Sequence, residues 1–246
     1  MEKLEGGNLT SVYKSGNTVL RSQGPWSPTI HRLLNHLEAE GFKDCPRFLG
    51  INENNEEILS FVQGISDETY PQGLTVEQHL DGMKILGDKI RRFHDISATF
   101  QKDPDDFWML SYDGGLEADV ICHNDIAPYN MTFIDGYPAG MIDFDTVCPG
   151  PRIWDIVYAL YRFVPFQVKN DDKKVDRFKA VEVFYEGYGM PVPANLFEVM
   201  IERLQALADY ILIQAEAGDV NFKRMLDEGH RALYLNDIAN IQKTYL

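Results

Sequence analysis

The chain has few cysteines, no long apolar run and a shortage of basic residues, and each absence excludes a class of protein. Its three cysteines, Cys45, Cys122 and Cys148, are too few and too scattered for a disulfide framework or a zinc cluster. No apolar run approaches the roughly 18 residues of a membrane span, and the opening residues MEKLEGGNLT contain no signal-peptide core. We therefore expect a cytoplasmic protein that has no membrane partner and packs its cysteines in the core.

The shortage of basic residues argues against a nucleic-acid partner. The chain carries 23 lysines and arginines against 38 aspartates and glutamates, a formal net charge of −15, whereas phosphate backbones attract basic surfaces. Residues 1–64 carry 6 basic and 8 acidic side chains, and residues 65–246 carry 17 and 30. The acidity of the longer part indicates either solubility alone or attraction for a cationic small molecule.

The first 64 residues show the alternation and turn signals of strands, with one helical stretch between them. The helix is expected at residues 27–42, because Ser27 can cap it, Pro28 suits its first turn and Gly41 can end it. Strands are expected around a Ser-Gly-Asn turn near residue 16 and around an Asn-rich turn near residue 54. This pattern predicts a small sheet with one helix, and Gly64 marks its boundary.

The chain from residue 65 onward is predicted to be mainly helical. Apolar residues recur at steps of three and four in its first helical stretch, and the second is apolar nearly all round, as in a buried helix. Helices are expected at residues 76–96, 154–164, 195–217 and 220–242. The fold class is therefore α+β, with a small β-rich lobe at residues 1–64 and a larger, mainly helical lobe at residues 65–246.

One stretch, residues 121–155, gathers acids and amides between short apolar runs: ICHNDIAPYNMTFIDGYPAGMIDFDTVCPGPRIWD. MTFI and AGMI are expected to pair as strands around DGYP, whose Asp-Gly is a strong turn signal. Asn130 and Asp143 are equidistant from the centre of this connection. We therefore expect their side chains near each other at the open end of the hairpin, where Asp125 can reach the same space.

These side chains suit a particular chemistry. An oxygen-only set of amide and carboxylate groups fits a hard cation such as Mg²⁺, which keeps waters and shares phosphate oxygens. A further carboxylate beside it fits a base that accepts or orients a hydroxyl proton, and phosphoryl transfer requires both. The alternative is that all three residues cap turns in a surface hairpin. Met141, Ile142 and Phe144 argue against this alternative, because a surface turn is expected to be more polar.

Two motifs in this stretch resemble those of a known family. HNDIAPYN resembles the H-G-D-x-x-x-x-N catalytic loop of the aminoglycoside phosphotransferase and choline-kinase-like family, with Asn124 in place of the glycine. IDFD resembles the metal-binding segment of the same enzymes, and the likeness extends over the first lobe and to about residue 165. The resemblance implies a bilobal protein-kinase-like fold, ATP or GTP and Mg²⁺ as cofactors, and a small-molecule acceptor.

The resemblance also implies roles for individual residues of the larger lobe. It assigns the catalytic base to Asp125 and the magnesium ligands to Asn130 and Asp143. Asp155 would be a buried acid that braces the catalytic loop, and His123 would orient the backbone of that loop.

Nucleotide binding is assigned to the first lobe, where the sequence departs from the family pattern. The resemblance implies a hinge whose backbone binds adenine, formed by Ser60, Phe61 and Val62. Arg21 stands where kinases have the lysine that holds phosphates, and the two side chains are not interchangeable. Ile30 or His31 lies near the position of that lysine's glutamate partner, and EGGNLTSVYK lacks the glycine-rich pattern of the phosphate loop.

Three functions are compatible with these residues. The leading one is an ATP-dependent kinase for a hydroxylated, cationic small molecule of the aminoglycoside or choline type. Only eleven residues separate Asp143 from Asp155, too few for the long activation loop of a protein kinase. The second is a nucleotide-binding pseudokinase or sensor, which the arginine in place of lysine favours. The third, a metal-dependent phosphohydrolase using His123, Asp125 and Asp143, lacks a second histidine at ligand spacing.

The acceptor-binding residues are not predicted. Four acids share one face of the helix expected at residues 195–217, and that face is either simply solvated or part of an acceptor site. They are Glu198, Glu202, Asp209 and Glu216.

Overall fold

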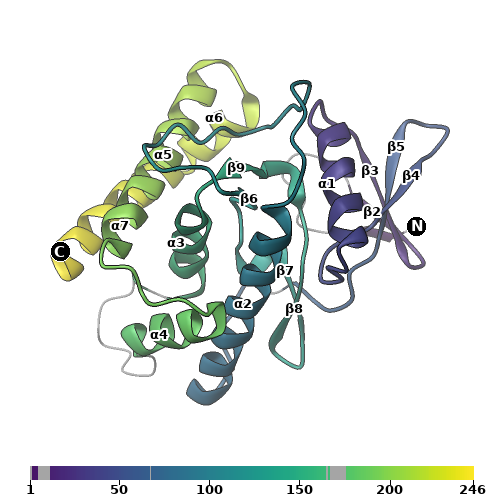
Figure 1. The fold of residues 1–246 in the computed structure, drawn as a ribbon. Helices are drawn as coiled ribbons and strands as arrows, with labels where there is room; N and C mark the ends of the chain where they lie inside the picture. Colours follow the sequence, from purple (N-terminus) through teal and green to yellow (C-terminus); the bar gives the residue numbers. More distant parts are fainter. Residues whose placement is uncertain (1, 5–11, 67, 165, 167–175) are drawn as a thin grey trace.

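The first lobe is a five-stranded antiparallel sheet with one helix (Figure 1). The computed structural model describes residues 2–4, 12–66, 68–164, 166 and 176–246. Both predicted hairpins are present, and the strand at the first residues was not predicted. In spatial order the strands are β1 (Glu2–Leu4), β2 (Val12–Ser15), β3 (Thr18–Ser22), β5 (Glu56–Ser60) and β4 (Phe48–Ile51).

The helix of this lobe, α1 (Ser27–Ala39), begins differently from the prediction. Ser27 does not cap it, because the residue at the N-cap is Trp26, which makes no side-chain cap hydrogen bond. The Ser27 hydroxyl instead accepts a hydrogen bond from the N–H of Gly24 at 3.0 Å, so it stabilises the turn before the helix. Pro28 lies in the first turn as expected, and Gly41 follows the helix end with a positive φ of 79°.

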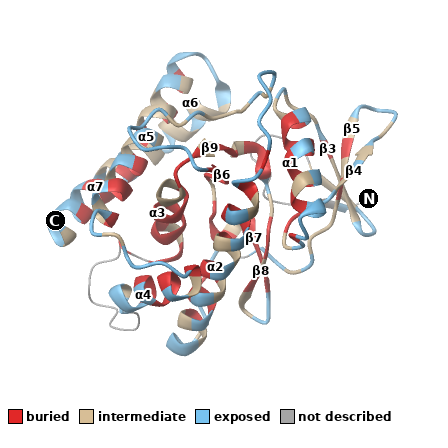
Figure 2. Ribbon diagram, viewed as in Figure 1, coloured by how far each residue is buried: buried red, intermediate tan, exposed pale blue. Residues whose placement is uncertain are grey.

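The second lobe is built from helices around the buried helix α3 (Figures 1 and 2). Three of its helices match the prediction closely, whereas α4 was not predicted and the helix expected at residues 220–242 is two helices. Gly229, with φ 84°, separates those two and turns the chain. The helices are α2 (Val76–Ser97), α3 (Arg152–Phe163), α4 (Arg177–Tyr188), α5 (Leu196–Glu216), α6 (Val220–Asp227) and α7 (His230–Tyr245).

Helices α2 and α4 cross with their backbones in close contact. A Cβ atom at Gly187 would lie 2.0 Å from the carbonyl oxygen of Lys84, and one at Gly87 would lie 2.1 Å from that of Phe184. Real Cβ contacts are never this short, so only glycine permits the crossing. The close packing fixes α4 against α2, the helix that also contacts strands of the acid-rich stretch.

The hairpin of β7 (Met131–Ile134) and β8 (Tyr137–Met141) has a tighter turn than predicted. Asp135 and Gly136, with φ 53° and 82°, form a two-residue loop of type I′, and β8 already begins at Tyr137. An irregularity between Thr132 and Phe133 then shifts the register. The carbonyl oxygen of Asn130 accepts the N–H of Ile142 at 2.9 Å. Asn130 therefore lies opposite Ile142 and not, as predicted, opposite Asp143, a difference of one residue.

The two lobes are joined by the segment after β5. Ile65 exchanges two backbone hydrogen bonds with Phe133 of β7, at 3.1 and 2.9 Å. Gly64 precedes it with φ 118°, and a Cβ atom there would lie 2.8 Å from the carbonyl oxygen of Phe133. The three cysteines are buried and unpaired, as predicted. Within the described ranges, no helix has both the length and the apolarity needed to cross a membrane.

Candidate active site

Asp125 lies in the loop after β6 (Val120–Cys122), and both oxygens of its carboxylate are held. The hydroxyl of Tyr129 donates to Oδ1 at 2.8 Å, and Nδ2 of Asn130 donates to Oδ2 at 2.7 Å. Both donors belong to the 3₁₀ helix Pro128–Asn130 that follows. Burial, together with the negative charge of Asp125, raises the pKa of Tyr129, which therefore remains protonated as a donor.

Asp155, in the first turn of α3, ties the backbone of this loop to the helix. Its carboxylate is fully buried and accepts the N–H groups of His123 and Asn124, each at 2.8 Å. Nε2 of His94 lies 3.0 Å from the same carboxylate. Burial raises the pKa of Asp155, but the hydrogen bonds and charges of the two histidines outweigh it and lower the pKa below its ordinary value. The Asp155 carboxylate is thus ionised, and in this form it accepts the hydrogen bonds that hold the loop.

Asn124 adopts a left-handed backbone, with φ 67°, which explains why the family motif has glycine here. Asparagine tolerates this conformation better than most residues. Its side chain also donates to the carbonyl oxygen of Thr146 at 3.0 Å, a bond that glycine cannot make. Nη2 of Arg203, from α5, donates to the backbone carbonyl of Asn124 at 2.8 Å. The loop is therefore anchored from both α3 and α5.

His123 connects the loop to the segment that carries Asp143. Its Nε2 lies 3.1 Å from the carbonyl oxygen of Ile142, and its own carbonyl accepts the hydroxyl of Thr146 at 3.0 Å. Nδ1 is buried and has no partner among the described residues. Asp143 follows Ile142 with φ 62°, so the chain turns away from β8 there, and its side chain is 49% exposed.

Arg21, on β3, contacts Asp143 and Asp145 and is almost fully buried. Its Nη2 is 2.7 Å from Asp145 and its Nη1 is 3.4 Å from Asp143. Burial lowers the pKa of the guanidinium, but the surrounding acids outweigh it and raise the pKa above its ordinary value. Asp145 is buried too. Burial and the neighbouring Asp143 raise its pKa despite the contact with Arg21.

The acid partner of Arg21 in the first lobe is Glu57, which was not predicted. Glu57 lies on β5 directly across from Arg21 and accepts a hydrogen bond from its Nε. The other carboxylate oxygen of Glu57 lies 2.5 Å from Nε2 of His31 on α1, whose ring stacks on Phe48 with 3.7 Å between centroids. The expected glutamate of the helix is thus replaced by a glutamate on the sheet that His31 supports. The sequence did contain a signal for this: Glu57 and Leu59 are two residues apart on β5, so the acid shares the inward face of the strand with an apolar residue.

The predicted hinge leaves one of its three backbone N–H groups for a ligand. The N–H of Ser60 donates to Arg47 at 2.9 Å, and that of Phe61 donates to Asn17 at 2.8 Å. The N–H of Val62 has no partner among the described residues. The Phe61 ring lies 3.7 Å below Nζ of Lys14. Residues 5–11, which hold most of EGGNLTSVYK, lie outside the described residues.

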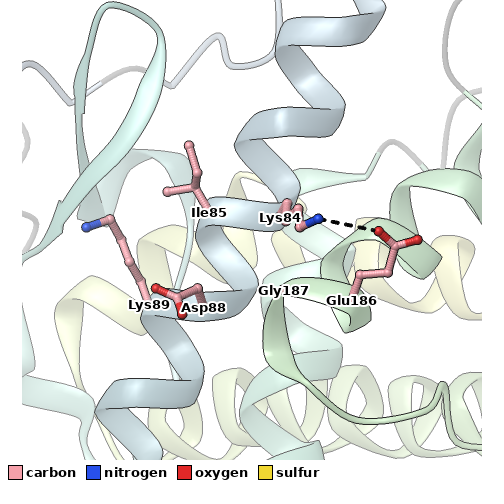
Figure 3. Close-up of a pocket in the computed structure, with 6 residues that line it drawn as sticks. All are labelled: Lys84, Ile85, Asp88, Lys89, Glu186 and Gly187. Atoms are coloured by element: carbon pink, nitrogen blue, oxygen red, sulfur yellow. Dashed lines mark ion pairs between the residues drawn. The ribbon is translucent and has the colours of Figure 1, made fainter.

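The described part of the chain contains no cluster of three or more histidine, cysteine or acidic side chains that could hold a metal ion. A surface hollow between α2 and α4 contains none of the predicted site residues (Figure 3). An ion pair between Lys84 and Glu186 crosses it at 3.8 Å, above the contact made by Gly187. The hollow is lined by Lys84, Ile85, Asp88, Lys89, Glu186 and Gly187.

Two sequence comparisons identify relatives of this chain. A model of the phosphotransferase enzyme family matches residues 108–189, the range that includes the Asp125 loop, Asp143 and Asp155. A trifolitoxin immunity protein of Rhizobium leguminosarum bv. trifolii is 32% identical over 206 residues, which are 76% of this chain and 73% of that protein.

Solved structures show the same fold at low identity. A complex of an APH(2″) enzyme with GDP and kanamycin superposes with a TM-score of 0.66 and 16% identity over 97% of this chain and 93% of that one. A choline/ethanolamine kinase family protein of Mesorhizobium loti gives 0.58 and 14% over 98% and 92%.

Fold and family together define a small-molecule phosphotransferase with a kinase-like, bilobal α+β fold. The chain belongs to the phosphotransferase enzyme family of aminoglycoside phosphotransferases and choline-kinase-like proteins. The predictions of this family, of the fold class and of a phosphotransferase are confirmed. The roles assigned to individual residues stay predictions.

Proposed function

We propose that this protein transfers the γ-phosphoryl group of ATP, or of GTP, to a hydroxyl of a small molecule, with Asp125 as the base. The observation that carries the proposal is the pair of hydrogen bonds, from Tyr129 and Asn130, that holds both oxygens of Asp125. A carboxylate oriented in this way keeps one lone pair on each oxygen for the acceptor hydroxyl. Asp155 and His123 hold the loop that carries it.

Magnesium fits the side chains beside Asp125. Asn130 donates its Nδ2 to Asp125, which leaves its amide oxygen without a hydrogen bond from the described residues. Asp143 is half-exposed, and among the described residues its hydrogen-bonding partner is Arg21, at 3.4 Å. One amide oxygen and one carboxylate are a set that Mg²⁺ completes with water and phosphate oxygens, and when bound the ion neutralises phosphate charge. Asn130 and Asp143 would hold it.

The first lobe would bind the nucleotide. Arg21 uses three of its five N–H groups on Glu57, Asp143 and Asp145, so two remain for phosphate oxygens. Its Nε stays on Glu57, which orients the guanidinium while the other edge faces the site. The backbone N–H of Val62 would donate to the adenine or guanine ring of the nucleotide. A cytoplasmic location, where ATP and GTP are abundant, agrees with three unpaired cysteines.

The acceptor belongs to one of several classes. The acidity of residues 65–246 favours a cationic acceptor, and related structures are complexes with aminoglycosides such as kanamycin. The trifolitoxin immunity protein, similar over most of the chain, adds that toxin to the acceptors to be tried. The four acids on one face of α5 favour the simpler alternative, a solvated face: Glu198, Glu202 and Glu216 are exposed, and Asp209 contacts Gln205 and Arg231.

A pseudokinase or sensor is the second candidate, and the closed ion-pair network of Arg21 is the observation that favours it. If binding of nucleotide cannot compete with Glu57 and Asp145 for the guanidinium, phosphates are held poorly and transfer is slow. The intact set of Asp125, Asn130 and Asp143 favours the enzyme.

The two candidates differ in acceptor-dependent release of ADP. The assay uses ATP and Mg²⁺ with a panel of hydroxylated amines, hydroxy acids, sugars and trifolitoxin, beside Asp143→Ala. The proposal expects ADP release that needs both the acceptor and Mg²⁺ and falls at least about a hundredfold in Asp143→Ala. Nucleotide binding without release over the whole panel would favour the sensor instead.

A further inference from the structure

Two arginines lie beside the loop of Asp125, and neither has a carboxylate partner among the described residues. Arg162, in the last turn of α3, places its guanidinium 5.2 Å from the ring centroid of Tyr129. Arg203 lies 4.8 Å from the ring centroid of Tyr158 and is engaged with the loop backbone. Most other arginines of the described ranges form ion pairs with acids. They are Arg21, Arg32, Arg47, Arg91, Arg92, Arg152 and Arg231.

Arg162 differs even from Arg203, because none of its N–H groups has a hydrogen-bond acceptor in the described part of the chain. Its Nε is buried without a partner, and the side chain as a whole is half-buried. Desolvating a guanidinium without a counter-ion costs free energy. With 38 acidic residues against 23 basic ones, the chain has acids in excess for pairing. An arginine left in this state is expected of a residue that pairs with a ligand.

The place of Arg162 relative to the base follows from Tyr129. The same ring that lies under the guanidinium carries the hydroxyl that donates to Asp125 at 2.8 Å. Tyr158, one helical turn before Arg162 on α3, has its hydroxyl 3.4 Å from that of Tyr129. Residues four apart lie on one face of a helix, so Arg162 and Tyr158 face the loop together. A group paired with Arg162 is therefore one tyrosine side chain away from the base.

We propose that Arg162 binds an anionic group, a carboxylate or a phosphate ester, on the acceptor whose hydroxyl faces Asp125. This inference rests on the proposed transfer function and names an anionic substrate class, in contrast to the cationic class that the overall charge favours. A guanidinium presents a planar fork that matches either anion, and the Arg162 guanidinium lies over the ring of Tyr129. The same arginine repels a quaternary ammonium, so a choline-like acceptor is disfavoured at this position.

The test compares three acceptors that each carry a hydroxyl: 3-hydroxybutanoate, glycerol 3-phosphate and choline. The proposal expects one of the two anions to be phosphorylated with a higher kcat/KM than choline. Arg162→Gln should raise the KM for that anion at least about tenfold and leave the KM for ATP unchanged. Arg162→Lys, which keeps the charge, should raise it less. Arg224→Gln, an exposed arginine of α6, is the matched control and should change none of these values.

The comparison of the two anions identifies the group that Arg162 takes. A higher kcat/KM for choline than for both anions, or an anion KM unchanged by Arg162→Gln, would overturn the proposal.

Equilibrium binding keeps this inference separate from the transfer function. Calorimetric titration of each anion into the wild type and into Arg162→Gln is made in the presence of ADP and Mg²⁺. Anion binding that depends on Arg162, without turnover of any acceptor, would support the inference and overturn the transfer function. Turnover of amines with no anion binding dependent on Arg162 would overturn the inference and support transfer.

Discussion

Glu57→Gln should destabilise the protein by about 3 kcal/mol, because it removes the negative charge of the carboxylate that contacts both Arg21 and His31. The Glu57 side chain is 1% exposed, and each of its carboxylate oxygens has one of these partners. Breaking a buried ion pair by removing one partner costs about 3–5 kcal/mol. We expect the lower end of that range, because Asp145 remains 2.7 Å from Arg21 and still compensates its charge.

The assay is urea unfolding, which gives the free energy of unfolding and the m-value for each variant. Glu56→Gln is the matched control: it makes the same change one residue earlier on β5. The Glu56 side chain is half-buried and accepts one hydrogen bond, from Asn52 at 2.8 Å. Its loss should cost at most about 1 kcal/mol. A Glu57→Gln protein within about 0.5 kcal/mol of the wild type would refute the reasoning that Glu57 anchors Arg21.

Other perturbations test separate parts of the account. Burial lowers the pKa of His79 from 6.5 to about 4. Between pH 6.5 and pH 4 the unfolded chain therefore binds more protons than the folded protein, so the free energy of unfolding decreases as the pH is lowered through this range. Urea unfolding over that range should show a shallower pH dependence in His79→Gln. Gly187→Ala should cost about 3 kcal/mol or more by forcing apart the contact with Lys84, and Gly115→Ala, with open space around it, should be nearly neutral. Asn124→Ala should be about 1 kcal/mol less stable than Asn124→Gly, because only glycine keeps the left-handed backbone without strain; equal thermal midpoints would contradict this.

Elements that depend on local patterns were predicted well. The hairpin around Gly16 follows from its turn residues, and the helix from Val76 begins where Thr75 and Gln78 form a capping box. The buried helix at residues 154–164 was recognised because an unbroken apolar surface suits few other places. The candidate catalytic loop and the candidate metal-binding segment could be proposed from the sequence because their residues lie close together in the chain at a characteristic spacing.

The failures involve tertiary contacts or single-residue shifts. The hairpin register moved by one residue because Tyr137 joined the strand and an irregularity followed at Thr132. Ser27 was assigned a cap by its residue type, but its hydroxyl bonds to a preceding turn. The single helix expected at residues 220–242 is broken at Gly229, whose effect is invisible to apolar periodicity alone.

The most informative miss is Glu57. Its partners Arg21 and His31 are 36 and 26 residues away in the chain, so no local pattern pairs them. The family pattern has this glutamate on the helix, whereas the structure places the acid on the strand beside Arg21. The same holds for Arg162, whose proposed role depends on the position of Tyr129 across the site.

The most direct test of the central claim is to measure MgATP affinity and phosphoryl transfer side by side in Asp125→Asn. Asn130 and Asp143 would bind the metal and Asp125 would serve the acceptor, so the account predicts an MgATP Kd within about threefold of the wild type. Transfer to the best acceptor should fall at least about a hundredfold, the contribution expected of a general base. Transfer that persists at the wild-type rate would contradict the assignment of Asp125, and so would a loss of activity explained by lost MgATP binding alone.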